Sequence, residues 1–122
     1  MNKHIMVVDD SKTIRNLLAF VIKSEGFKVT AAEDGLDALE KLYSMGTVDL
    51  IVSDVNMPRM DGFTFIKTLR EQDAYKDVPV IVLSTEGKEQ DIATGMSLGA
   101  NLYMVKPAEP AKMIRNIKML LG

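Results

Sequence analysis

Short apolar runs alternate along this chain with longer amphipathic stretches, and this alternation restricts the possible folds more than any other feature. Apolar runs of strand length occupy residues 5–8, 48–52, 78–83 and 102–105, and a weaker alternating segment occupies 29–31. Runs this rich in Val, Ile and Leu are typical of strands that are buried on both faces. The sequence therefore predicts five short strands, most of them interior to a sheet.

Helical periodicity fills the intervals between these strands. Apolar residues in 14–22 and 113–121 recur at the spacing of a helix with one buried face. The stretches 36–45, 62–72 and 88–98 show this period less cleanly, but their length and helix-forming residues favour helices. Three helices are expected to stop at glycines, namely Gly26, Gly46 and Gly99. Methionines mostly fall on predicted core faces, so we assign packing roles to Met6, Met96, Met104, Met113 and Met119.

The order of strand then helix, repeated five times, predicts an α/β fold with a parallel sheet covered by helices on both faces. Right-handed crossovers leave few topologies for five strands, and the doubly wound order 2-1-3-4-5 suits a single domain of 122 residues. In that order a crevice opens between the first and third strands, beyond their carboxyl ends. We therefore expect the functional residues directly after the strands.

Composition removes several classes of function. The chain has no cysteine, which excludes disulfides, thiolate metal sites and cysteine nucleophiles. Its one histidine, His4, opens an apolar run and is expected in a strand, so neither a multi-histidine zinc site nor a Ser-His-Asp triad is indicated. A net charge of −2 gives no electrostatic reason to expect direct nucleic-acid binding. The apolar run near the start is too short for a signal peptide or a membrane span, so we expect a cytoplasmic protein.

Four of the five predicted strands are followed at once by a charged or hydroxyl residue. Asp9 and Asp10 come after the first strand, Asp54 after the third, Ser84 after the fourth and Lys106 after the fifth. Each of these alone is most simply a polar loop start, but a doubly wound sheet would bring them to one edge. Three carboxylates that meet there repel one another unless a cation lies among them. An oxygen-only ligand set points to Mg²⁺, ahead of Mn²⁺ or Ca²⁺.

These residue types suit the transfer of a phosphoryl group to a carboxylate. Asp54 is the candidate nucleophile, because a bound cation would offset the repulsion between its carboxylate and an incoming phosphate. Lys106 would supply a positive charge to one phosphoryl oxygen, and the Ser84 hydroxyl would supply a hydrogen bond to another. The turn at 57–62 lies beside Asp54 and could lend a backbone carbonyl to the metal, with that of Asn56 the best placed.

Several motifs, in this order and spacing, resemble the receiver domain of two-component response regulators. They are Val7-Val8-Asp9-Asp10, Ser53-Asp54-Val55-Asn56-Met57-Pro58 with Asp61-Gly62, Ser84, and Val105-Lys106-Pro107. The resemblance runs from about residue 3 to residue 121 and implies a flavodoxin-like fold, for which CheY is a known example of the order 2-1-3-4-5. Because nothing follows the fifth predicted helix, the chain resembles a stand-alone, CheY-like regulator, with one receiver domain at 1–122 and no output domain.

The resemblance implies a role for each residue of the acidic edge. Asp9 and Asp10 would be the acidic pair, and Asp10 the usual direct ligand of Mg²⁺. Asp54 would be both the phosphorylation site and a second metal ligand. The backbone carbonyl of Asn56 would complete the share of the metal shell that the protein provides.

The resemblance also implies a switch and its partners. Ser84 would follow the phosphoryl group, Lys106 would pair with it, and Tyr103 matches an aromatic switch position whose ring turns inward when the hydroxyl moves. The phosphodonor would be a histidine kinase. The surface formed by the fourth helix, fifth strand and fifth helix would then bind an output protein, in chemotaxis the flagellar motor switch, and a phosphatase would be a further partner.

Some positions depart from the commonest receiver pattern. Thr85 stands where Ala or Gly is usual, which would reduce access for small donors or water. Ala108 stands where Phe is frequent, which would weaken one packing contact but not the chemistry. Glu86 and Asn56 occupy positions that tune dephosphorylation, and together they resemble the CheY type, with a short-lived phosphoryl state. The Lys106–Pro107 bond is a candidate cis peptide.

We interpret the chain as a signalling switch that transfers and loses its own phosphoryl group, not as an enzyme in the usual sense. One alternative is a Mg²⁺-dependent phosphatase acting through an aspartyl phosphate, although such enzymes usually carry a second carboxylate where this chain has Asn56. A second alternative is a phosphate sink or relay in a phosphorelay. A flavodoxin-like cofactor binder is disfavoured, because the chain has no Gly-rich phosphate loop, no Trp and few aromatic rings.

Overall fold

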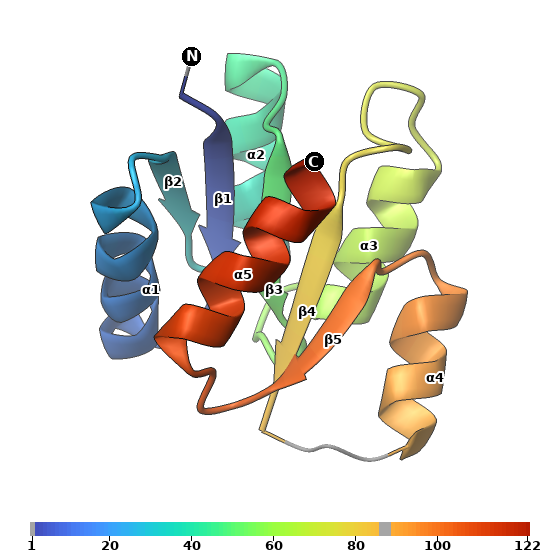
Figure 1. Cartoon of the computed structure of the whole chain (residues 1–122). Helices are drawn as coiled ribbons and strands as arrows, with labels where there is room; N and C mark the ends of the chain where they lie inside the picture. Colours follow the sequence, from blue (N-terminus) through green and yellow to red (C-terminus); the bar gives the residue numbers. More distant parts are fainter. Residues whose placement is uncertain (1, 86–88) are drawn as a thin grey trace.

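Five parallel strands form one sheet in the order β2-β1-β3-β4-β5 (Figure 1). We describe the protein from a computed structural model, in which residues 2–85 and 89–122 are described. The strands are β1 (His4–Val8), β2 (Lys28–Ala32), β3 (Leu50–Asp54), β4 (Val80–Ser84) and β5 (Leu102–Val105). The predicted α/β class and doubly wound order are therefore confirmed, and His4 is a strand residue as expected.

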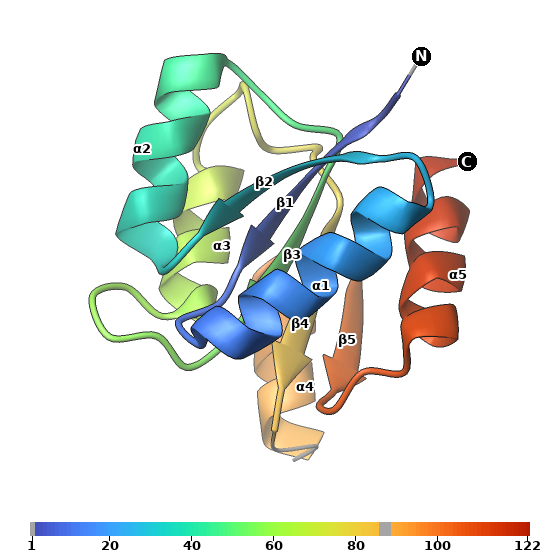
Figure 2. The same cartoon turned by 90° about the vertical axis from the view of Figure 1, so that its left-hand side faces the viewer.

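Helices cover both faces of the sheet. They are α1 (Lys12–Ser24), α2 (Gly35–Met45), α3 (Gly62–Arg70), α4 (Glu89–Ser97) and α5 (Pro110–Leu121). Helices α1 and α5 lie on one face, and α2, α3 and α4 lie on the other (Figure 2). The longest helix, α1, has 13 residues, and within the described ranges no helix has the length and hydropathy needed to cross a bilayer.

Two hydrophobic cores lie on the two faces of the sheet, and β1 contributes to both. Ile5 and Val7 join the core beneath α1 and α5, whereas Met6 and Val8 join the core beneath α2 and α3, since successive strand residues point to opposite faces. All residues of β3 and β4 are buried. Burial on both faces explains why these strands appear in the sequence as continuous apolar runs.

Helix starts gather at the carboxyl edge of the sheet, and within residues 2–85 and 89–122 three of them are capped by side chains. Each capping oxygen accepts a hydrogen bond from the backbone N–H three residues on, at 3.3 Å for Ser11, 2.9 Å for Asp34 and 2.8 Å for Asp61. At the opposite end of α2, Gly46 has a φ of 98° and ends the helix in a conformation that favours glycine. These caps fix the loops on which the functional residues lie.

Two strands begin later than the sequence predicts. Strand β3 begins at Leu50 rather than at residue 48, and β4 begins at Val80 rather than at residue 78. The residue before each strand explains the difference. Asp49 accepts a hydrogen bond from the backbone N–H of His4 at 2.7 Å, and Pro79 has no N–H to donate to a neighbouring strand.

The packing role predicted for the methionines is only partly correct. Met6, Met104 and Met113 are buried, but Met96 and Met119 are 44% and 61% exposed. Met119 lies two positions after a buried residue of α5, which turns it about 200° around the helix and away from the core. In α4 the apolar period is weak, so the sequence gives no reliable inner face.

Candidate functional site

Three carboxylates meet at the carboxyl edge of the sheet, where the winding reverses between β1 and β3. Asp9 and Asp10 directly follow β1, as the sequence predicts. Asp54 is the last residue of β3, whereas the sequence predicts it in the loop after that strand. One oxygen from each of the three side chains lies within 4.8 Å of the others. Asp9 and Asp54 are buried, whereas Asp10 is exposed. The sequence prediction that these residues converge is confirmed by the geometry.

Lys106 reaches this cluster from the end of β5. Its Nζ lies 2.8 Å from Oδ2 of Asp9 and 3.2 Å from Oδ1 of Asp54, and its side chain is only 10% exposed. Burial disfavours the charged amine, but its hydrogen bond to Asp9 and the charge of Asp54 outweigh burial and raise the pKa of Lys106. The lysine is therefore protonated at neutral pH. The Lys106–Pro107 peptide bond is cis.

Opposing electrostatic effects act on the buried carboxylate of Asp54 at the end of β3. Burial raises the pKa of Asp54 most, and the nearby charge of Asp9 raises it further. Lys106 and the backbone N–H of Val55, which donates to Asp54 Oδ1 at 2.8 Å, act in the opposite direction. The net effect is a carboxylate whose charge is not fully compensated by the protein.

The donor set of the cluster fits a hard divalent cation. Carboxylate oxygens are the ligands that Mg²⁺ and Ca²⁺ prefer. Three carboxylates face one lysine, so a cation at this position would remove like-charge repulsion that Lys106 only partly offsets. Asn56, expected to contribute its carbonyl, lies in the loop after β3 with an exposed side chain. Its role as a ligand stays a prediction.

The expected switch residues lie on the next two strands of the sheet. Ser84 is buried at the end of β4, one residue beyond the Leu83 that pairs with Asp54. Tyr103 is half-buried on β5 and packs against the core beneath α2 and α3. The switching roles of Ser84 and Tyr103 stay predictions, and Glu86 lies outside the described residues.

The two neighbouring departures from the receiver pattern differ in their surroundings. Thr85 is exposed directly after Ser84. Ala108 is half-buried and packs against the core beneath α1 and α5. Ala108 therefore keeps a packing contact with a smaller side chain, and the access that Thr85 would reduce stays a prediction.

Sequence reasoning missed the part that Gly62 plays at this site. A Cβ on Gly62 would overlap the backbone carbonyl oxygen of Asp54 and would lie 2.9 Å from Cα of Val55. The N–H of Gly62 also donates to the carbonyl of Val55 at 2.7 Å. The loop that follows Asp54 therefore closes on itself only if the first residue of α3 has no side chain. The Asp61-Gly62 pair signalled a turn but did not reveal this contact.

Arg59 and Asp34 were also missed, and they form an ion pair between the loop after β3 and the start of α2. The distance from Nε of Arg59 to Oδ2 of Asp34 is 2.6 Å. An aspartate followed by glycine at the start of a predicted helix is a recognisable capping signal. The sequence contains no comparable signal for its arginine partner, 25 residues further along the chain.

The sequence model of the response regulator receiver domain matches residues 5–118. The chain belongs to this family. Receiver domains take a phosphoryl group from histidine kinases and act on effectors, and they generally bind Mg²⁺ at an acidic pocket. In this receiver domain the carboxylates of Asp9, Asp10 and Asp54 form an acidic cluster.

Similar proteins include one that this chain covers almost completely and one that it covers by about half. This receiver domain is 34% identical over 119 residues to the chemotaxis protein CheY1 of Helicobacter pylori, covering 97% of this chain and 96% of that protein. It is 39% identical over 121 residues to PhoP, the alkaline phosphatase synthesis transcriptional regulatory protein of Bacillus subtilis, covering 99% of this chain but 49% of PhoP. The structure of the Vibrio cholerae chemotaxis protein CheY4 matches with a TM-score of 0.92 and 35% identity, covering 98% of this chain and 99% of that one. The receiver domain is therefore CheY-like in fold.

Proposed function

We propose that this cytoplasmic receiver domain accepts a phosphoryl group from a histidine kinase on Asp54 and thereby switches the surface formed by α4, β5 and α5. The observation that carries the proposal is the position of Asp54, a buried carboxylate at the strand end. It lies within 4.8 Å of two more carboxylates and 3.2 Å from Nζ of Lys106, whose side chain is 10% exposed. Mg²⁺ would be held by the carboxylates of Asp9, Asp10 and Asp54 and by the backbone carbonyl of Asn56. When bound, the ion would neutralise charge on the phosphoryl oxygens.

The transfer uses the carboxylate of Asp54 as nucleophile. One oxygen of Asp54 forms a bond to phosphorus while the bond from phosphorus to the histidine nitrogen breaks, and that nitrogen keeps the electron pair and takes up a proton. Lys106 already contacts Oδ1 of Asp54, so it is positioned to pair with a phosphoryl oxygen attached there. Attack by water on phosphorus later returns the free carboxylate. The protein promotes both steps on itself, which separates it from an enzyme that turns over a separate substrate.

The switch would follow from the new charge. The Ser84 hydroxyl would donate a hydrogen bond to a phosphoryl oxygen, and the loop after β4 would move with it. Tyr103 lies next to α4, since a Cβ on Gly95 would be 3.7 Å from its ring. A change in the position of the Tyr103 ring would therefore alter its packing against α4.

The output partner that we propose is a flagellar motor switch protein, with a role in chemotaxis. The support is similarity over nearly the whole chain to the chemotaxis proteins CheY1 and CheY4. A hollow lined by Tyr103, Pro107 and Lys112 lies on the proposed output surface. It offers a partner apolar contacts and two opposite charges, because Glu109 lines it together with Lys112.

Phosphorylation of a single carboxylate can be tested directly. The purified protein is incubated with Mg²⁺ and phosphoramidate, a small phosphodonor, and the attached phosphoryl group is located by mass spectrometry. We expect one phosphoryl group on Asp54, labile to alkali as an acyl phosphate is, and none in Asp54→Asn. The control Asp49→Asn changes an aspartate at the opposite edge of the sheet, which accepts a hydrogen bond from His4, and it should still be labelled. Undiminished labelling of Asp54→Asn at another residue would contradict the proposal.

A further inference from the structure

A charged pair outside the acidic cluster links the loop after β3 to the first turn of α2. Arg59 donates from Nε to Oδ2 of Asp34 at 2.6 Å and from a terminal nitrogen to Oδ1 at 3.1 Å. Such two-pronged pairing fixes orientation as well as distance. Asp34 is only 2% exposed, and the hydrogen bond from Arg59 lowers the pKa of its carboxyl. A buried carboxylate is unfavourable without a partner, so Asp34 holds Arg59 in place.

A second contact attaches the same loop to the same helix. The N–H of Gly35, the first residue of α2, donates to the carbonyl oxygen of Met60 at 3.3 Å. A Cβ on Gly35 would lie 2.7 Å from Cγ of Met60, so the loop rests closely on the helix. Arg59 and Met60 are thus both bound to the N-terminal end of α2.

The base of the loop is fixed at the phosphorylation site itself. Val55 donates its N–H to Oδ1 of Asp54 at 2.8 Å and accepts at its carbonyl from the N–H of Gly62 at 2.7 Å. Asn56 lies between this base and the tip formed by Arg59 and Met60. The position of the Asn56 backbone therefore depends on both attachments.

Arg59 also lies close to the acidic cluster. It lines one shallow pocket together with Asp10, Pro58 and Asp34. Its hydrogen bonds nevertheless go to Asp34, with Glu33 3.8 Å away. The guanidinium is therefore held by the start of α2, while the carboxylate of Asp10 stays available at the cluster.

We propose that Asp34 and Arg59 form a positioning pair that holds the loop after β3 so that the carbonyl of Asn56 is presented to a divalent cation. The inference rests on the proposed Mg²⁺-dependent phosphoryl acceptance and adds a determinant of metal affinity to it. Neither residue touches the reacting atoms. Both act through the loop, as outer partners commonly act on the ligands of a metal.

The direction of the effect separates positioning from simple electrostatics. Arg59 is a positive charge near the cluster, so its charge alone opposes a second cation. Removing that charge would by itself strengthen Mg²⁺ binding. Loss of positioning weakens Mg²⁺ binding instead, and the sign of the change therefore shows which effect is larger.

The experiment is a Mg²⁺ titration of the whole protein followed by backbone amide NMR shifts. In Arg59→Met we expect Mg²⁺ to bind about tenfold more weakly, at the lower end of the range typical for outer partners of metal ligands. Arg59→Lys keeps the charge but not the two-pronged geometry, and it should also weaken binding. The control Lys118→Met removes an equally exposed cation from an ion pair on α5 and should leave the affinity unchanged.

A double variant tests whether the two residues act as a unit. Asn is as good a helix cap as Asp, so Asp34→Asn preserves the start of α2. Asp34→Asn combined with Arg59→Met restores the net charge and should bind Mg²⁺ no more weakly than either single variant. Losses that simply add would overturn the pair as a unit.

Folding is measured for each variant without Mg²⁺, and Arg59→Lys decides if Arg59→Met does not fold. Unchanged or tighter Mg²⁺ binding in folded Arg59 variants would overturn the positioning pair and leave the proposed function intact. A wild-type protein that fails to bind Mg²⁺ would overturn both. The two failures are therefore distinguishable in one set of titrations.

Discussion

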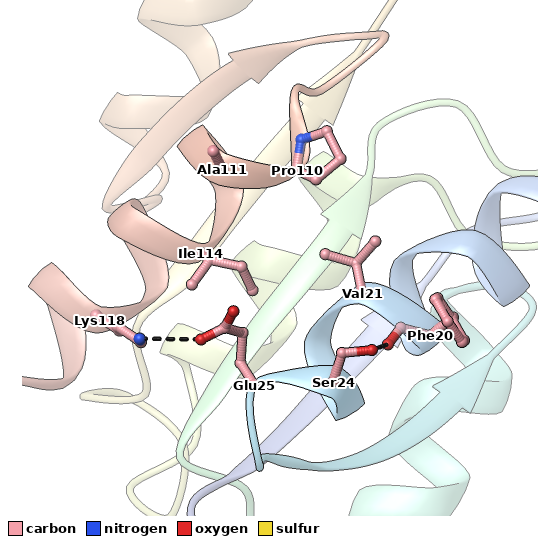
Figure 3. Close-up of a pocket in the computed structure, with 8 residues that line it drawn as sticks. All are labelled: Phe20, Val21, Ser24, Glu25, Pro110, Ala111, Ile114 and Lys118. Carbon is pink, nitrogen blue, oxygen red and sulfur yellow. Dashed lines mark hydrogen bonds and ion pairs between the residues drawn. The ribbon is translucent and has the colours of Figure 1, made fainter.

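Two lysine ion pairs of nearly equal length lie in contrasting regions of this molecule. At the acidic edge, Lys106 is 2.8 Å from Asp9, and the two side chains are 10% and 0% exposed. In the last turn of α5, Lys118 is 3.0 Å from Glu25 at the end of α1 (Figure 3), and these side chains are 58% and 42% exposed. The distances alone would rank the two pairs as equivalent. Their burial separates them, because charges screened by water interact weakly and buried charges strongly.

The two regions also differ in the size of their hollows, and the larger hollow is not the one beside the carboxylates. The groove between α1 and α5 has a volume of about 470 Å³, and Phe20, Val21 and Ile114 supply much of its apolar lining (Figure 3). The pocket that includes Asp10 has a volume of about 260 Å³. The larger hollow holds one exposed ion pair, whereas the smaller one adjoins the converging carboxylates. In this fold, the strand ends locate the chemistry better than the size of a cavity does.

The largest expected difference comes from making the same substitution in both ion pairs. Lys106→Met leaves two buried carboxylates without their cation and should lower the free energy of unfolding by about 3 to 5 kcal/mol at neutral pH. Lys118→Met should lower it by less than about 1 kcal/mol. Urea unfolding of both variants without Mg²⁺ checks the comparison. Equal losses would mean that burial does not distinguish the pairs.

A smaller difference is expected from a glycine substitution in each region. In Gly62→Ala the new Cβ meets immovable backbone at Asp54 and Val55, and the loss should be about 3 kcal/mol. Gly26, just past α1, has a φ of 92° and no atom within 4 Å of an added Cβ, so Gly26→Ala should lose only about 1 kcal/mol from backbone strain. Thermal unfolding of the two variants measures the difference. A loss in Gly62→Ala no larger than that in Gly26→Ala would contradict the close contact.

The smallest expected effect is a pH-dependent increase in the free energy of unfolding when Asp54 is replaced by Asn. Because burial and Asp9 raise the pKa of Asp54, the folded protein binds this proton more tightly than the unfolded chain does. The stability that Asp54 contributes is therefore present below its ordinary pKa of 3.8 and is lost as pH rises through the raised value. Asp54→Asn should be more stable than wild type at neutral pH, by less than Lys106→Met loses.

This gain should shrink as the pH falls through the raised pKa of Asp54 towards the ordinary value of 3.8, because the folded wild type then takes up this proton. Unfolding curves for wild type and Asp54→Asn across that range measure the trend. Asp73→Asn, on an exposed turn after α3, serves as the matched control and should show no such trend. A pH-independent gain in Asp54→Asn would mean that the charge is not its origin.

The sequence was sufficient for the fold because burial on both faces leaves a strong local signal. In β3 and β4 all residues are buried, so their positions appeared as uninterrupted apolar runs. The strand starts were wrong where a side chain or a proline intervened, at Asp49 and Pro79. Such effects depend on which group lies opposite, and a linear pattern does not contain that information.

The site was predictable in its residues and only partly in its contacts. Asp9, Asp54 and Lys106 follow from strand ends and from the topology, which brings them to one edge. The pairing of Asp34 with Arg59 and the tight approach of Gly62 to Asp54 depend on how a loop folds back. Loop conformation is set by contacts between residues that are distant in sequence, and the sequence pattern does not show which residues meet.

Helix α4 is attached to the rest of the molecule by very little buried surface. Among its nine residues, all of which the structure describes, only Gly95 is buried. Substitutions at exposed positions usually change stability by less than about 0.5 kcal/mol. The exposed side chains of α4 can therefore be substituted without unfolding the protein or disturbing the carboxylates. The proposed output surface can therefore diverge in evolution while the cluster of carboxylates is inherited unchanged.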